Sequence, residues 1–253
     1  MISTATYFSY KWYNVGMKTT TKIIIILVVL LTSAYVFTKQ NSADVDQASD
    51  SVPLPSDFLS VRPGVSALPT QAISEDEKQG LLYMREEEKL ARDVYITLFE
   101  KWGVPIFSNI SQSEQTHTEA VRAILVKYNI KDPVTNDTVG VFVNAELKKL
   151  FDDLVKRGEV SVEEALSVGA FIEDLDIMDL QNNISKTDNE DIKLVYENLM
   201  RGSRNHLRSF VSQLKSRGVT YKPEYITEQE YESIIASPKE NGSGGSGRGW
   251  GNN

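Results

Sequence analysis

The chain has 253 residues, of which 41% are hydrophobic and 25% are charged, as in ordinary globular domains. Its net charge of −8 argues against nucleic acid as a partner, because phosphates need a basic surface. The sequence contains no cysteine, which excludes disulfides, thiolate metal sites, iron–sulfur clusters and a cysteine nucleophile, and it contains only two histidines.

Residues 1–38 are predicted to form an N-terminal signal peptide or membrane anchor. Two lysines precede an apolar run at 23–31, and small residues follow it, in the order of a secretory signal. The uncharged stretch 23–38 is shorter than the ~20 residues that a spanning helix prefers, so a cleaved signal and an uncleaved anchor both stay open. Lysines before the run and aspartates after it predict that the rest of the chain lies outside the cytoplasm, secreted or membrane-anchored.

The next segments divide by composition. Residues 39–72 are rich in Ser, Asp and Pro and are predicted to be a disordered linker. Residues 237–253 are predicted to be a disordered Gly-rich tail. The range between them, 73–236, is predicted to be one helical domain.

Capping residues and glycine or proline breakers predict the helices of this domain. They are expected from Ser74 to about Trp102, from about Phe107 to Tyr128, after Asn144 to a stop at Gly158, from Ser161 towards Ile184, from about Asn189 to Arg217, and after Thr227. Four long helices in two pairs with short turns, joined by one long middle connection, predict an all-α four-helix bundle followed by a short C-terminal helix.

Each long helix has an apolar stripe, with steps of three and four residues, that polar residues interrupt near its middle. Buried carboxylates are costly when isolated, whereas a metal cation compensates a group of them. Carboxylates and the only two histidines stand at matching heights on the four stripes, which predicts a metal site. Its expected ligands are Glu88, Glu114, His117, Glu173, Asp176 and His206, and Ser203 also lies on the stripe of the fourth helix.

Each of these residues also has a purely structural interpretation. Glu88 would pair with Arg92 four residues on, a histidine on an apolar face is commonly a hydrogen-bonded core residue, and Asp176 would face solvent. The alternative function is therefore a non-catalytic binding or structural module. In it, former ligands hold one another through hydrogen bonds and through Arg92, Arg204 or Arg208.

Several segments carry a resemblance to a known superfamily. The segment Glu88–Arg92 with Tyr95 resembles the first helix of the rubrerythrin-type di-iron carboxylate proteins, within the ferritin-like superfamily. Glu114 and His117 match the E-x-x-H of the second helix, and Glu173 with Asp176 resembles the paired acids of the third. The core as a whole is similar, over about 160 residues, to an uncharacterised prokaryotic ferritin-like family in the segments EEEKLARDVY, IFSNISQSEQTH and RGSRNHLRSF.

This resemblance implies a ferritin-like four-helix bundle with one long middle crossover connection. The resemblance brings no assigned activity of its own. The leading hypothesis is a metal-binding domain, for which a di-iron or single-metal oxidoreductase acting on dioxygen or peroxide is one possibility. Rubrerythrin-like peroxidase turnover would need an external reductant, because the chain has no cysteine-rich electron-transfer module. No catalytic residue is assigned.

One position departs from the resemblance. Ser203 stands where the rubrerythrin type has a second bridging glutamate, so either Asp176, water or hydroxide completes a di-iron centre or the site holds a single metal. Carboxylate and imidazole ligands without sulfur favour iron, with manganese or zinc as alternatives.

Overall fold

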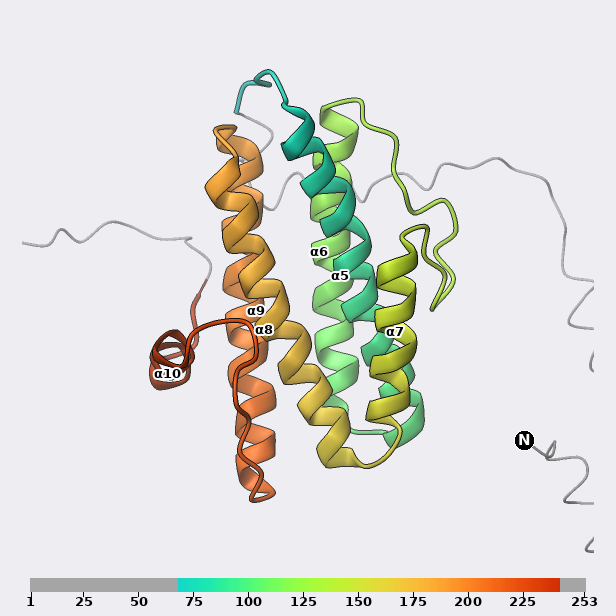
Figure 1. The fold of residues 1–253 in the computed structure, drawn as a ribbon, viewed down its shortest axis with the longest axis vertical. Coiled ribbons are helices and arrows are strands. Elements are labelled where there is room, and N and C mark those ends of the chain that lie inside the picture. The colour runs from blue at the N-terminus through green and yellow to red at the C-terminus, as the bar shows by residue number, and fades with distance from the viewer. Residues whose placement is uncertain (1–67, 242–253) are drawn as a thin grey trace, which may run out of the picture. The chain divides into compact units, whose positions relative to one another are not determined.

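The structure is a computed structural model that describes residues 68–241 (Figure 1). This range contains helices and no strand, which confirms the predicted all-α helical bundle. The helices are α5 (Glu75–Trp102), α6 (Pro105–Lys127), α7 (Ala145–Gly158), α8 (Val162–Lys186), α9 (Glu190–Ser216) and α10 (Glu228–Ala236).

Four long helices form the bundle. α5 pairs with α6 and α8 pairs with α9 through short turns, while α5 also packs against α8 and α6 against α9. α6 ends at one end of the bundle and α8 begins at the other, so the connection between them runs along its length (Figure 1). α7 lies in this crossover and packs against α5 and α8.

The helix ends follow the capping residues that the sequence contains. Ser74 and Glu77 form the expected reciprocal capping box at the start of α5, and the side chain of Asn144 caps α7. Gly158 differs from the prediction, because it is the last residue of α7 and has no positive φ. A Cβ there would lie 2.6 Å from the Leu98 side chain, so close packing against α5 accounts for this glycine.

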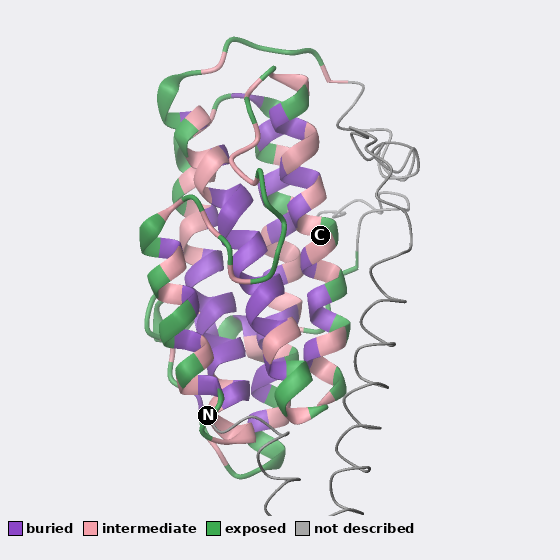
Figure 2. Cartoon of the chain, turned by 90° about the vertical axis from the view of Figure 1, so that its right-hand side faces the viewer, coloured by how far each residue is buried: buried purple, intermediate pink, exposed green. Residues whose placement is uncertain are grey.

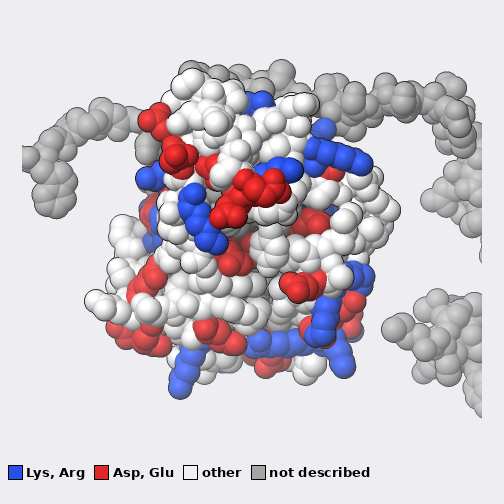
Figure 3. Space-filling view, turned by 45° about the horizontal axis from the view of Figure 1, so that its top comes forward, with Lys and Arg blue, Asp and Glu red and all other residues white. Residues whose placement is uncertain are grey.

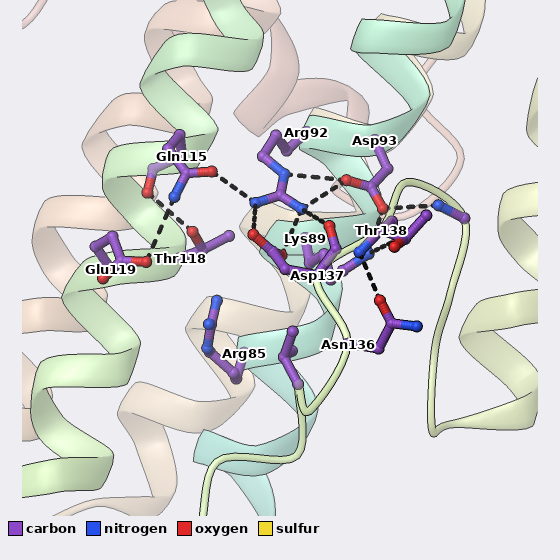
Figure 4. A network of polar contacts seen from close by, with 12 residues as sticks. Arg85, Lys89, Arg92, Asp93, Gln115, Thr118, Glu119, Asn136, Asp137 and Thr138 are labelled. Atoms are coloured by element: carbon purple, nitrogen blue, oxygen red, sulfur yellow. Dashed lines mark hydrogen bonds and ion pairs between the residues drawn. The ribbon is translucent and has the colours of Figure 1, made fainter. Parts of the chain in front are cut away.

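The outer face of α5 holds the crossover by charged contacts (Figure 4). Arg92 donates to both carboxylate oxygens of Asp137 and to Gln115 of α6. Lys89 is fully buried, pairs with Asp93 and donates to the carbonyl of Thr138. α5 is therefore buried on two sides, one in the bundle and one under the crossover.

The inward-facing stretches of the bundle helices are coloured as buried in Figure 2, and the apolar core that they form divides into two clusters. One cluster includes Leu81, Met84 and Ile124, and the other includes Phe107 and Phe210. The partly buried Met200 contacts both. The two clusters lie on either side of the polar interruptions of the four stripes, which therefore form a layer across the bundle.

The predicted flanking segments lie largely outside the described residues: the signal or anchor (1–38), most of the linker and the end of the tail. Inside the described range, no helix is long and apolar enough to cross a membrane. Near the two ends of the described range, Lys127 donates to the carbonyl of Leu68, and Glu240 binds Arg204 and Arg208. Acidic and basic side chains are interspersed on the face that Figure 3 shows.

Candidate metal centre

The polar layer brings together side chains from all four bundle helices. Each comes from the middle of its helix, so the interruptions predicted at matching heights do meet in space. Their exposed fractions are 2% for Glu88, Glu114 and Glu173, 6% for Asp176, 1% for Ser203 and 9% for His206, and the side chain of His117 is 12% exposed.

Glu114 of α6 lies between the two histidines. Its Oε2 is 2.6 Å from Nδ1 of His117, and its Oε1 is 2.7 Å from Nδ1 of His206. Glu88 approaches His117 Nδ1 at 3.3 Å, and Glu173 approaches His206 Nδ1 at 3.4 Å. The layer thus contains two groups of potential ligands that share Glu114: Glu88, Glu114 and His117, and Glu114, Glu173 and His206.

Several buried polar atoms of this layer have no hydrogen-bond partner among the described residues. They are Glu88 Oε1, Glu114 Oε1, Asp176 Oδ1 and His206 Nδ1. Glu114 Oε1 and His206 Nδ1 are close together, yet they are not aligned as a hydrogen bond. This arrangement suits a cation, because ligand atoms of a metal site point at the metal and not at one another.

Further contacts orient the potential ligands. Tyr95 of α5 donates to Glu173 Oε1 at 2.5 Å, and Nε2 of His206 lies 3.0 Å from the Ser113 hydroxyl. When this Nε2 carries the proton, Nδ1 of His206 is free to bind a metal. Such contacts to the far side of a ligand are typical of metal sites.

Asp176 and Ser203 border the same space from α8 and α9. The Ser203 hydroxyl, which has one proton to donate, lies within hydrogen-bonding distance of Asp176 Oδ2 and, at 3.0 Å, of the Leu199 carbonyl oxygen. This leaves Asp176 Oδ1 unpaired on a buried carboxylate. Asp176 does not face solvent, contrary to the structural alternative, and neither ligand group contains it.

The electrostatics of the layer follow from burial and from the contacts between its acids and histidines. Burial lowers the pKa of His206, but Glu114 and Glu173 outweigh it and raise that pKa to about 10. Burial raises the pKa of Glu88 to about 7, against the opposing effect of His117. Burial, with Glu88 nearby, holds the pKa of Asp176 well above its usual range. In the metal-free protein, imidazolium groups thus balance part of the negative charge.

Gly202 and Ser113 contact the two histidines, although neither is among the ligands predicted from the sequence. A Cβ at Gly202 would lie 2.5 Å from the His117 ring, so only glycine lets α9 approach that side chain. A glycine inside a helical pattern is a usable signal for such a contact. Ser113 has no such signal in the sequence, because a serine on a helix is common without any contact to a metal ligand. The arginines of the structural alternative bind elsewhere: Arg92 holds the crossover, and Arg204 binds Glu240.

Comparisons with known proteins give one family and one relative of known structure. A family model described as an uncharacterised protein domain (DUF2202) matches residues 77–238. The uncharacterised protein MJ0754 of Methanocaldococcus jannaschii is 60% identical over 178 residues, which cover 70% of this chain and 96% of that protein. The crystal structure of the hypothetical protein MJ0754 matches with a TM-score of 0.68, over 69% of this chain and 99% of that one.

Proposed function

This chain belongs to the DUF2202 domain family, and from the buried layer of its domain we propose a metal-binding protein of the ferritin-like, rubrerythrin-type kind. The observation that carries the proposal is Glu114, whose two oxygens face two histidines on different helices. A carboxylate in that position suits two cations, one beside each imidazole.

Charge supports two cations rather than one. The carboxylates of Glu88, Glu114, Glu173 and Asp176 are all buried, and two divalent cations would neutralise all four of them while both imidazoles stay neutral. Protonated histidines can balance only part of this charge, which agrees with the raised pKa values of Glu88 and Asp176. Iron fits the mixed oxygen and imidazole donors, with manganese and zinc as competitors.

A redox-active metal held here would supply electrons for reactions with dioxygen or peroxide. The chain's own residues bind and orient it: Tyr95 fixes Glu173, and Ser113 fixes the ring of His206. The apolar clusters on either side keep bulk water out of the layer. Turnover would require an external reductant, since the chain contains no cysteine for an electron-transfer cluster.

The amino-terminal sequence supports a second part of the proposal, that the domain works outside the cytoplasm. The support is the order of lysines, apolar run and aspartates before residue 68. Fractionation of cells that produce the full chain tests this part. A full-length protein recovered only from the cytosol would contradict it.

Two observations favour the alternative, a non-catalytic module with a degenerate site. Ser203 stands where a second bridging carboxylate is expected, and the histidines already pair with carboxylates.

Elemental analysis of the purified chain after anaerobic incubation with Fe²⁺ separates the two functions. We expect about two equivalents of tightly held metal, as a two-metal site requires. Less than about a tenth of an equivalent, with a melting temperature that chelators leave unchanged, would establish the degenerate site.

A further inference from the structure

Glu87 is a buried carboxylate that the proposed centre does not use. It precedes Glu88 on α5 and is only 3% exposed, and no N–H or hydroxyl group in the described part of the chain donates to its oxygens. The group within hydrogen-bonding reach of Glu87 is another carboxyl group, that of Asp179. The strongest charges near it are acids, namely Asp176, Asp179 and Glu88. Two buried acids in contact share either a proton or a cation, because two adjacent carboxylates without a compensating charge repel each other.

The position of Glu87 lies between the surface and the centre. On α8, Asp176 borders the buried layer, and Asp179 follows one turn later and is half-buried. Asp179 lines a surface pocket together with Tyr83 and Asp76, and Lys186 is the one basic residue in its lining. On α5, Glu87 follows the pocket residue Tyr83 by about one turn, and on α8 Asp179 follows Asp176 by the same step. The carboxyl groups of Glu87 and Asp179 therefore lie between the pocket and the centre.

We propose that Glu87 and Asp179 form an outer cation position through which divalent metal ions pass from the surface pocket to the buried centre. This inference rests on the proposed metal-binding function. Oxygen-only ligands hold Fe²⁺ or Mn²⁺ more weakly than a site that adds imidazoles, which suits a position that must release its ion inwards. The acids along the path draw cations in, as a cleft of one charge sign does.

The two histidines offer metal ions an alternative route to the centre, one that does not pass Glu87 and Asp179. The side chains of His117 and His206 are 12% and 11% exposed, so an ion could reach the centre between α6 and α9 without meeting Glu87. Loading kinetics distinguish the two paths. The amount bound at equilibrium reports on the centre, and the rate of loading reports on the path.

The experiment uses Co²⁺, whose visible absorption changes on binding, mixed with the metal-free full chain in a stopped-flow instrument. Glu87→Gln and Asp179→Asn each replace one ionisable carboxyl group by an amide, with little change of shape. Glu100→Gln is the matched control, because Glu100 is an exposed carboxylate on the same helix. Glu88→Gln is the reference for loss of a ligand of the centre.

We expect Glu87→Gln and Asp179→Asn to bind the same final amount of Co²⁺ as the wild type, but to load about tenfold more slowly or worse, in line with charge-focused association. Glu100→Gln should load at the wild-type rate. Wild-type loading rates in either path variant would overturn the inference. So would a loss of stoichiometry in Glu87→Gln like that in Glu88→Gln, because Glu87 would then be a ligand of the centre. If the wild type binds no metal, the proposed function itself fails, and this inference falls with it.

Discussion

At the scale of single residues, His117 gives the most direct test of the centre. Its Nδ1 lies within 3.3 Å of Glu88 and 2.6 Å of Glu114, so His117→Ala removes the donor that these two acids share. We expect this variant to lose stoichiometric metal binding, and with it the rise in melting temperature on loading. That rise corresponds to about 2.7 kcal/mol when free metal is at about 100 times Kd. Calorimetry with and without metal measures both quantities.

The matched control is Val121→Ala, which shortens a fully buried apolar residue one turn further along the same face of α6. It should lower the melting temperature of the metal-free and loaded forms alike, because it removes packing without touching a ligand. A stabilisation by metal that survives in His117→Ala would show that the ions bind somewhere else.

Ser203 gives a second test at this scale. Its hydroxyl donates to buried Asp176, so Ser203→Ala leaves a carboxylate oxygen without its donor. The expected loss is about 1–3 kcal/mol in the free energy of unfolding, measured with urea. The variant should also bind metal more weakly if Asp176 substitutes for the missing bridging glutamate. Ser203→Thr keeps the hydroxyl and should restore affinity; equal affinity in all three proteins would exclude that role for Asp176.

At the scale of elements, the ends of the helices were largely readable from the sequence. A capping residue such as Ser74 or Thr227 determines a helix start locally, so distant contacts hardly shift it. The outer face of α5 was not readable in this way. Lys89 and Asp93 look like an exposed charged pair until the crossover covers them, and no local pattern shows where a long connection will pack.

This buried pair allows a comparison with an exposed one of the same spacing. Lys89→Met leaves the fully buried Asp93 with Arg92 as its remaining cationic partner, which should cost about 3 kcal/mol in the free energy of unfolding, the lower end for a broken buried pair. Lys148 and Asp152 have the same four-residue spacing on the surface of α7. Lys148→Met should therefore have a much smaller effect, because exposed ion pairs contribute little. Urea titrations of both variants provide the measurement, and similar losses would show that the crossover does not bury the Lys89 pair in solution.

At the scale of the whole molecule, the metal-free protein should lose stability as the pH rises. The pKa of His206 is raised to about 10 in the folded state, so its contribution is complete below about 6.5 and is lost as the pH approaches 10. Glu88, with its pKa raised to about 7, adds a cost that grows between about pH 4.5 and 7. Thermal melts of the metal-free chain from pH 5 to 10 should therefore decline. The loaded form should not show this decline, because a metal keeps the imidazoles neutral and the carboxylates compensated.

The location of the candidate centre followed from the sequence because two rare histidines and several acids interrupt four apolar stripes at one height. The shared position of Glu114 did not follow, since the helix register gives the face of a residue but not which oxygen meets which ring. Glu87 illustrates the same limit. It is one of three consecutive glutamates, and only the packing of α5 separates the one that faces the crossover, the one near α8 and the one in the centre.

The division of the apolar core by the polar layer has a consequence for cooperativity. Each half has its own apolar cluster, and in the metal-free chain the layer between them contains pairs of imidazolium and carboxylate groups. A pair of bound cations would replace these contacts with ligand bonds from all four helices. Loading would then merge two weakly coupled folding units into one, so that amide hydrogen exchange on both sides of the layer slows together.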